Sequence, residues 1–572
     1  MREIGLRFGI TVTLCFLALS AGLLTFAKKA AADEATFFGK TAEELFPDSA
    51  FPPSSPNIIA AARANAFRLL LSAGIPDGHG LGQGKTITVA SLGNGPTSGI
   101  SGTMYFWRPA FEAATGATME IVEIPFNQLE TTIPTNFLTG LDSYDIIVNA
   151  AWFYGDYIAN GWIQPIDRFI GDKRFPQWDP KATVPTIHQL YTWDGKQYGT
   201  QLDADAQLLY YRRDILSDPK WRAAYKQATG EDLPNPPRTW QQLLRVTTFF
   251  HGKDYNGDGK PGDGISLHLK VGGQGMFHFM ALSGAFSITP NPGADPKKVT
   301  PYHNIYWFDP DTMEPLINRP GQLAALEFLK DLAATGQEAQ FGWELAEAWQ
   351  NFLNGNAIAT FSWGDVGSLS QNPDKSRIKG KLGAAPLPCS DTWYDMEQKR
   401  MITDTAHPNC VGDTVGGSWH PVLSAFTKEP ELSYFFMAML ATPAINFFDE
   451  TTGWQGIDPC CDYSFFAPLG KATIDDYIIM GYDSSDVKGY IPAYAANLTQ
   501  FPVYEPYLRI PGTPAYLTAL DTRLSEAMTG QKSAKQALDD TAGDWKHITA
   551  DSGGAEIQLK LYQSSIGYTP GK

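Results

Sequence analysis

Apolar and polar positions alternate with two different periods from Lys85 onward, which predicts strands and helices in regular succession. Short apolar or alternating runs, bounded by turn residues, are typical of strands, and longer runs with helical spacing are typical of helices. The expected order is strand, helix, strand, helix, strand, helix, over residues 87–91, 105–115, 118–124, 129–138, 144–148 and 154–160. Such an order predicts an open α/β sheet with ligand-binding loops at the carboxyl ends of its strands.

A second informative segment runs from Trp193 to Leu216. A Trp-Asp-Gly-Lys turn is followed by a polar and apolar alternation at Gln201, Leu202 and Asp203, and then by the apolar run 208–211. This pattern predicts an extended segment that ends in a new helix. We interpret it as a strand that crosses between two lobes.

The amino terminus has the pattern of a secretory signal peptide. Arg2 and Arg7 precede an apolar run over 8–26, and an Ala-x-Ala sequence ends at Ala32. We expect cleavage there and a periplasmic location. A retained membrane anchor is the alternative, because the run is near the length that spans a bilayer.

Charge excludes some partners. Without residues 1–32, the chain keeps 40 basic and 60 acidic residues, a net charge of about −20. An acidic surface repels nucleic acid phosphates and anionic lipids, so we expect neither as a partner. The length predicts at least two domains.

Several motifs occur in the order found in one family of proteins. They are Asp194-Gly195-Lys196-Gln197-Tyr198-Gly199 with Tyr210-Tyr211, Gly161-Trp162-Ile163-Gln164-Pro165-Ile166-Asp167, Pro237-Arg238-Thr239-Trp240, the helix 323–332 and the strand 380–388. Over residues 85–550 the chain resembles family 1 bacterial extracellular solute-binding proteins, the maltose-binding-protein type. It departs from the family pattern at Gln201-Leu202, where a proline is usual, and at Arg212-Arg213, where Asn-Lys is usual.

The resemblance implies an α/β, two-lobed periplasmic-binding-protein fold (type II, several hinge crossings) with a ligand cleft between the lobes. The expected organisation is a signal peptide at 1–32, an extension and linker at 33–84, lobe 1 at 85–201 plus 388–450, and lobe 2 at 202–387 plus 451–572. Returns to lobe 1 and lobe 2 are expected near 382–388 and 451–457. The implied function is the solute-binding component of an ABC importer, a monomer that delivers its ligand to a membrane permease and needs no cofactor.

Candidate ligand-binding residues follow the strand ends and the crossings. Aromatic faces stack on sugar rings, and carboxylates accept hydrogen bonds from hydroxyl groups. The candidates are Asn94, Trp152, Tyr154, Asp203, Asp205, Trp363, Asp365, Trp419 and Trp454. For each tryptophan the alternative is a role in packing, and for Asp203 and Asp205 it is a solvated edge or a helix cap.

A glycine-rich acidic loop suggests a calcium site. Asp254, Asn256 and Asp258 occupy positions 1, 3 and 5 of a calcium-binding loop, and Lys260 offers its carbonyl. Position 12 is Ile265 instead of glutamate, so Asp263 would have to supply the remaining ligand. Structural calcium is therefore one hypothesis, and a plain Asx turn is the other.

The cysteines outside the predicted signal peptide are even in number, at 389, 410, 460 and 461. In an oxidising compartment they favour disulfides over metal binding. Cys389 with Cys410 is the simplest pairing, which leaves a vicinal pair. Cross-linking between the two couples is the alternative.

The aromatic and acidic mixture favours a neutral sugar, oligosaccharide or polyol as the solute. An aromatic box with Asp365 would also suit a quaternary amine through cation-π contact. A third possibility is a secreted glycoside hydrolase that uses paired carboxylates, for which the close acid pairs are Asp203/Asp205, Glu344/Glu347 and Asp475/Asp476. No catalytic motif accompanies these pairs, so we expect no enzyme.

Overall fold

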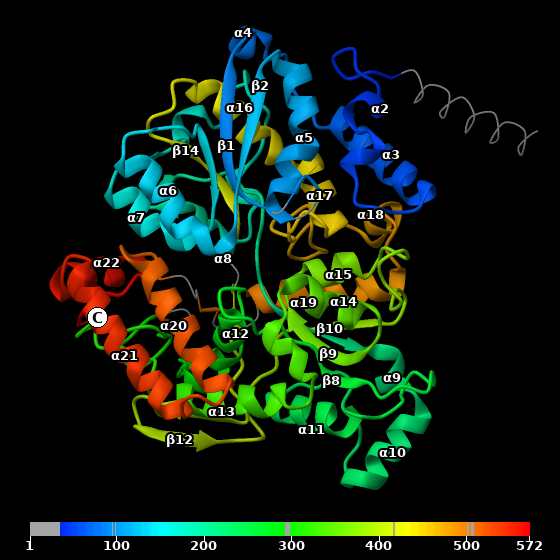
Figure 1. Ribbon diagram of the computed structural model, residues 1–572, viewed down its shortest axis with the longest axis vertical. Coiled ribbons are helices and arrows are strands. Elements are labelled where there is room, and N and C mark those ends of the chain that lie inside the picture. The colour runs from blue at the N-terminus through cyan, green and yellow to red at the C-terminus, as the bar shows by residue number, and fades with distance from the viewer. Residues whose placement is uncertain are drawn as a thin grey trace, which may run out of the picture.

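The computed structural model describes residues 35–93, 95–97, 99–291, 298–413, 415, 418–499, 503–504 and 508–571. The predicted signal peptide lies outside these residues. Figure 1 shows two lobes, one above the other, with an N-terminal extension beside the upper lobe and the C-terminal helices beside the lower one. Among the described helices, none has both the length and the apolar character needed to cross a membrane.

Lobe 1 is built on a five-stranded sheet of order β2-β1-β3-β14-β4. β1 pairs in parallel with β2 and β3, whereas β14 is antiparallel to β3 and β4. The strands are β1 (Thr86–Leu92), β2 (Thr118–Ile124), β3 (Ile146–Asn149), β4 (Ile163–Gln164) and β14 (His420–Ser424). The helices are α5 (Gly99–Thr115), α6 (Leu129–Leu138), α7 (Tyr154–Ala159), α8 (Pro185–His188), α16 (Pro430–Leu440) and α17 (Pro443–Thr452). The predicted order of strands and helices in this region is confirmed.

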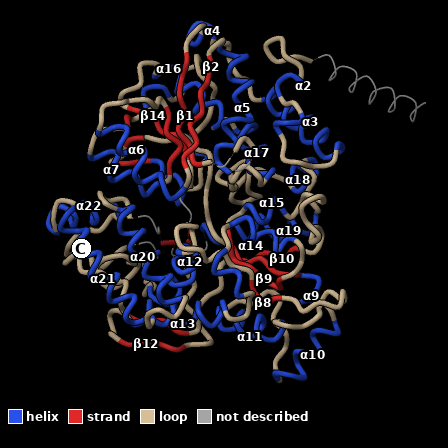
Figure 2. Tube along the Cα trace, in the orientation of Figure 1, coloured by secondary structure: helices blue, strands red, loops and turns tan. Residues whose placement is uncertain are grey.

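Lobe 2 is built on a four-stranded sheet of order β10-β7-β9-β8, which lies in the lower half of Figure 2. The strands are β7 (Leu208–Arg212), β8 (Asp263–Ile265), β9 (Ala357–Ser362) and β10 (Leu382–Ala385). The helices are α9 (Arg213–Ser217), α10 (Pro219–Thr229), α11 (Trp240–Phe250), α12 (Met276–Ser287), α13 (Pro320–Ala333), α14 (Leu345–Leu353), α15 (Asp365–Leu369), α18 (Ile474–Ile479) and α19 (Ser484–Thr499). All residues of β7 and β9 are buried, as expected for strands covered on both faces.

Three further parts complete the chain. The N-terminal extension contains α2 (Ala42–Leu45), α3 (Pro56–Ser72) and α4 (His79–Gly82), and α3 packs on α17. The C-terminal helices are α20 (Thr513–Met528), α21 (Ala534–Asp551) and α22 (Ala555–Ser565). Short paired strands are β5 (Thr192–Trp193) with β6 (Lys196–Gln197), β11 (Thr392–Asp395) with β12 (Arg400–Thr403), and β13 (Gly412–Asp413) with β15 (Val503–Tyr504).

The return to lobe 1 comes later than the predicted boundary at residue 388. β10 pairs antiparallel with β7, and the β11–β12 hairpin packs on α12 and α13, so all of these strands belong with lobe 2. The chain re-enters lobe 1 only beyond Val411, where β14 begins at His420. Strand pairing and hairpin packing depend on contacts with distant segments, so the local sequence pattern at 380–388 does not predict them.

The first crossing is held by hydrogen bonds at the residues that replace the usual proline. The Gln201 side chain donates to the carbonyl oxygen of Ala441 (3.1 Å) and accepts from the Thr183 hydroxyl (2.8 Å). Just before it, Gly199 forms a β-bridge with Val422. The outgoing and returning segments therefore lie side by side.

The cysteine side chains lie in two close pairs. The sulfur atoms of Cys389 and Cys410 are 1.94 Å apart, and Cys460 lies beside Cys461. The alternative in which the two couples cross-link does not occur in this structure.

Candidate functional site

Asp203 and Asp205 lie on the first crossing, in the extended segment that leads into β7, and both are buried. The two carboxylate oxygens of Asp203 accept hydrogen bonds from the backbone N–H groups of Asp458 and Trp419, each at 2.8 Å. Asp205 accepts from the backbone N–H of Ser418 at 3.0 Å. These two side chains thus join the first crossing to the returning segment at Ser418 and Trp419 and to the segment at Asp458.

Asp365 and Asp458 lie on the lobe 2 side of the same place. Asp365 is the first residue of α15, directly after β9 and the Trp363-Gly364 turn. Asp458 Oδ2 accepts a hydrogen bond from the Gly364 backbone N–H at 2.8 Å and from the Tyr494 hydroxyl at 3.0 Å. Asp458 Oδ1 and Asp365 Oδ1 are buried and accept no hydrogen bond within the described part of the chain.

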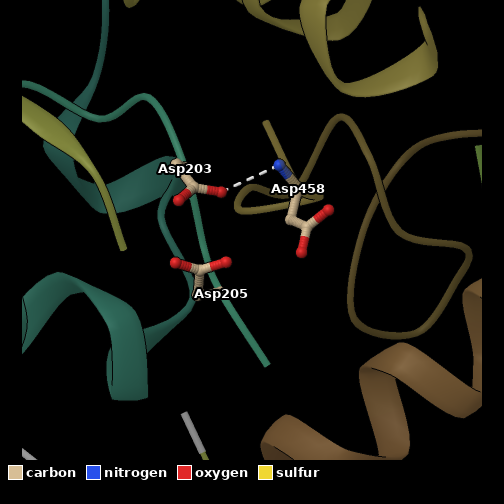
Figure 3. A group of neighbouring side chains, drawn as sticks. All are labelled: Asp203, Asp205 and Asp458. Atoms are coloured by element: carbon tan, nitrogen blue, oxygen red, sulfur yellow. Dashed lines mark hydrogen bonds between the residues drawn. The ribbon is translucent and has the colours of Figure 1, made fainter. Parts of the chain in front are cut away.

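The side chains of Asp203, Asp205 and Asp458 are neighbours, as Figure 3 shows. One oxygen from each of the three lies within 4.8 Å of the others. Within the described ranges, none of them or Asp365 forms an ion pair with lysine, arginine or histidine. We call these residues, Asp203, Asp205, Asp365 and Asp458, the aspartate cluster.

Burial and mutual repulsion disfavour the charged forms of this cluster. Desolvation raises the pKa of Asp203 to about 7, although the N–H groups of Asp458 and Trp419 act in the opposite direction. Desolvation raises the pKa of Asp205 well above its usual value, and the negative charges of Asp203 and Asp458 raise it further. The pKa values of Asp365 and Asp458 are raised for the same two reasons.

Aromatic side chains from both lobes lie next to the cluster. Trp363 donates its indole N–H to the Val415 carbonyl (2.6 Å) and meets Phe277 edge to face at 5.7 Å between ring centroids. Phe277 in turn contacts Trp152 of lobe 1, which lies 5.7 Å from Trp419. Because these rings are almost fully buried, a solute can reach them only when the lobes move apart.

The structure brings together most of the predicted ligand-binding residues. The structure places Asp203, Asp205, Trp363, Asp365 and Trp419 in or beside the cluster. Trp152 contacts Phe277 and Trp419, and we call Trp152, Phe277, Trp363 and Trp419 the aromatic wall. Their role in binding stays a prediction. Asn94 lies outside the described residues.

The remaining two candidates lie elsewhere. The hydroxyl of Tyr154 is 2.8 Å from His420 Nε2, inside the core of lobe 1 behind the first crossing. Trp454 contacts Phe106 of α5 and borders a surface pocket under α3 that also includes Phe51. The turn Gly453-Trp454-Gln455-Gly456 resembles a cleft loop in the sequence, but the N-terminal extension lies against it.

Sequence reasoning missed Asp458, Phe277 and His268. Asp458 directly follows the predicted third crossing, so extending that segment by one residue would have found it. Phe277 and His268 gave no local signal, because their places beside Trp363 depend on how α12 packs against the end of β8. Burial lowers the pKa of His268 to about 3, so its ring is neutral.

The glycine-rich loop is organised by hydrogen bonds to its own backbone. Asp254 accepts from the N–H groups of Gly257, Asp258 and Gly259. The side-chain amide oxygen of Asn256 accepts a hydrogen bond from the Arg212 guanidinium at 2.9 Å. Asp263 accepts from the amides of Gln337 and Asn351, and Asp258 accepts from the backbone N–H of Lys260. These contacts favour the Asx-turn interpretation, and calcium binding here stays a prediction.

The architecture defines a class: two α/β lobes, joined by segments that run side by side, with a polar and aromatic site between them. Family comparison agrees with this class. Residues 107–460 match the model of the family described as "Bacterial extracellular solute-binding protein". The chain belongs to this family, and the predicted resemblance is confirmed.

Known relatives are distant in sequence. The sn-glycerol-3-phosphate-binding periplasmic protein UgpB of Yersinia pseudotuberculosis is 24% identical over 392 residues, covering 67% of this chain and 74% of that protein. A solute-binding protein from Agrobacterium radiobacter K84, solved with ribitol, has a TM-score of 0.61 at 18% identity and covers 82% of this chain and 99% of that one. T. maritima MalE3, solved with maltose, has a TM-score of 0.56 at 19% identity, with 81% and 99% covered. The predicted two-lobed fold is therefore confirmed.

Proposed function

We propose that this protein captures a neutral polyol or sugar between its lobes and delivers it to the membrane permease of an ABC importer. The observation that carries the proposal is the juxtaposition of buried carboxylate acceptors with aromatic faces from both lobes. Asp458 Oδ1 and Asp365 Oδ1 lack hydrogen-bond donors in the described structure, and a solute rich in hydroxyl groups supplies them. The rings of Trp363 and Trp419 lie beside the cluster, and the C–H side of the same molecule would pack against them once the lobes move apart.

The negative charge of the aspartate cluster favours a neutral solute over a phosphorylated one. UgpB is named for sn-glycerol 3-phosphate, but the aspartate cluster has no cationic partner among the described side chains. A phosphate group placed beside these carboxylates would meet strong repulsion in a site of low dielectric. Neutral solutes such as the ribitol and D-mannitol bound by two structural relatives fit this electrostatic environment better.

The enzyme alternative loses two of its three acid pairs. Glu344 and Glu347 form a capping box at the start of α14. Asp475 and Asp476 lie in the first turn of α18, where Asp476 completes a capping box with Thr473. Helix caps stabilise helix ends and need no catalytic explanation. The family and its structural relatives are transport proteins that bind solutes.

The proposal extends to the cellular setting. Export by the amino-terminal segment would place the protein in the periplasm, where Cys389–Cys410 and Cys460–Cys461 would be oxidised. We expect a monomer that presents its closed form to the permease.

Calorimetry with a solute panel tests the function. Ribitol, D-mannitol, maltose, glycine betaine and sn-glycerol 3-phosphate are titrated into the protein in a buffer that contains Ca²⁺. We expect binding by at least one neutral polyol or sugar, and none by the phosphate ester. Binding of glycine betaine alone would support the quaternary-amine alternative, and preferred binding of the phosphate ester would overturn the proposal.

A further inference from the structure

We propose that Asp203, Asp205 and Asp458 hold a hard divalent cation of the size of Ca²⁺, and that this cation binds hydroxyl oxygens of the solute. The second half of the proposal rests on the proposed function, and the first half stands on the geometry alone. Calcium takes carboxylate oxygens at about 2.3–2.6 Å, so oxygens that share one ion lie within about 5 Å of one another. One carboxylate oxygen from each of the three aspartates meets this condition, since these three atoms lie within 4.8 Å of one another.

Hydrogen bonds from the backbone orient the three carboxylates. Asp203 accepts backbone N–H groups at both oxygens, and Asp205 and Asp458 each accept one. An N–H donor favours the charged carboxylate, and it also orients the oxygen, as outer partners do in metal sites. Each carboxylate has about four lone-pair positions, so these bonds leave positions open for an ion.

Asp365 supplies the independent observation that a ligand belongs here. It lies on a different element, at the start of α15, and its carboxyl is almost fully buried. Its Oδ1 accepts no hydrogen bond from any described residue, and its charge acts directly on Asp458 and Asp205. A Cβ placed on Gly456, two residues before Asp458, would lie 3.9 Å from this oxygen. A buried oxygen without a described hydrogen-bond donor, on a residue whose charge adds to the repulsion at Asp205 and Asp458, needs a positive or hydrogen-donating group.

A cation accounts for the balance of charge better than the solute alone. Adjacent buried carboxylates repel one another, and the described chain places no lysine or arginine against them. Solute hydroxyls donate hydrogen bonds but bring no net charge, whereas a divalent ion offsets the repulsion. Oxygen-only ligand sets suit Ca²⁺ and Mg²⁺ rather than softer metals, and the hydroxyls of a polyol complete the coordination of Ca²⁺.

Terbium luminescence tests the cation half directly. Tb³⁺ is a calcium substitute, and excitation of Trp363 and Trp419 should sensitise an ion bound at the cluster. The metal-free full-length protein is titrated with Tb³⁺, and the Asp458→Asn and Asp205→Asn variants are compared with Asp254→Asn in the glycine-rich loop. We expect Tb³⁺ affinity to fall by about tenfold or more in both cluster variants, and to stay unchanged in Asp254→Asn. Thermal unfolding of each variant shows that it is folded.

Ribitol or the best neutral solute is then titrated with Ca²⁺ and with EDTA. We expect its Kd to rise by about tenfold or more in EDTA, since the ion is removed from the contact. Equal affinity in both conditions, or Tb³⁺ emission lost only in Asp254→Asn, overturns the proposal. If Tb³⁺ binds the cluster but no neutral solute binds in either condition, the cation site stands and the proposed solute class is wrong.

Discussion

The side chain of Asp203 accepts a hydrogen bond from the backbone N–H of Asp458, 255 positions further along the chain, at 2.8 Å. This bond joins the first crossing between the lobes to the segment that leads from lobe 1 into the last part of lobe 2. The proposed ligand site and the segments that cross between the lobes therefore share residues. If the lobes open and close around the solute, we expect a change in what Asp203 binds to affect these segments.

Replacing Trp363 tests the aromatic wall. We expect Trp363→Ala to weaken binding of the neutral solute by about tenfold, because a buried aromatic face contributes about 1–2 kcal/mol to a sugar or polyol contact. Trp454→Ala is the matched control, because that ring packs under the N-terminal extension instead. Calorimetry measures both. A larger loss in Trp454→Ala than in Trp363→Ala would contradict the placement of the site.

The hydrogen bonds of Gln201 make the first crossing rigid. In Gln201→Ala, the Thr183 hydroxyl and the Ala441 carbonyl lose a buried partner. We expect the free energy of unfolding to fall by about 1–3 kcal/mol, as measured by denaturant titration. The control is Gln398→Ala, whose side chain makes an exposed bond to Asp395 and should change stability by less than about 0.5 kcal/mol. Equal effects of the two changes would show that the crossing does not depend on Gln201.

The C-terminal helices connect the lobes through α20. The Thr518 hydroxyl donates to Glu130 of lobe 1 at 3.0 Å, while Asp521 accepts from Gly272 of lobe 2. If these contacts belong to the closed form, Thr518→Val should raise the solute Kd by about fivefold, the equivalent of one hydrogen bond of about 1 kcal/mol. Thr522→Val is the control, since the Thr522 hydroxyl bonds only within its own helix, to the Thr518 carbonyl. An unchanged Kd in Thr518→Val would mean that this contact persists when the lobes open.

The Cys389–Cys410 pair encloses the β11–β12 hairpin, with a sequence separation of 21. A cross-link of this span restricts the unfolded chain and stabilises the folded one by about 3 kcal/mol. We expect the double variant Cys389→Ser, Cys410→Ser to lose about 2–4 kcal/mol of unfolding free energy. Solute affinity should stay the same, because no residue of the hairpin belongs to the aspartate cluster or to the aromatic side chains beside it, although the hairpin packs on α12 and α13. Free thiols in the unreduced protein, detected by thiol labelling, would contradict the pairing.

The glycine-rich loop is expected to depend on Asp254 as a hydrogen-bond acceptor. In Asp254→Asn the three backbone N–H groups lose a charged acceptor, and we expect about 1 kcal/mol less stability. The loss should be equal in Ca²⁺ and in EDTA. A loss seen only in Ca²⁺ would support the calcium hypothesis for this loop.

The local pattern of the sequence was sufficient for much of lobe 1 and for several site residues. Strand and helix periods between 85 and 166 depend on neighbours a few positions apart, so they could be read from the chain itself. Asp203, Trp363 and Asp365 are predicted as candidates because ligand sites in α/β folds gather at strand ends and crossings, and their role in binding stays a prediction. The order of motifs was enough to indicate the family.

The tertiary structure decided which distant segments of the chain contact one another, and local sequence patterns do not predict these contacts. Whether Trp454 faces the cleft or the N-terminal extension depends on how α3 packs on α17, and the boundary predicted at 388 moves because the β11–β12 hairpin packs on α12 and α13 of lobe 2. Asp458 became part of the site because a backbone N–H and a carboxylate 255 positions apart in sequence meet in the fold. The sequence determined the elements and the chemistry available at their ends. Folding decided which of those ends meet, because contacts between distant segments depend on the packing of the whole chain.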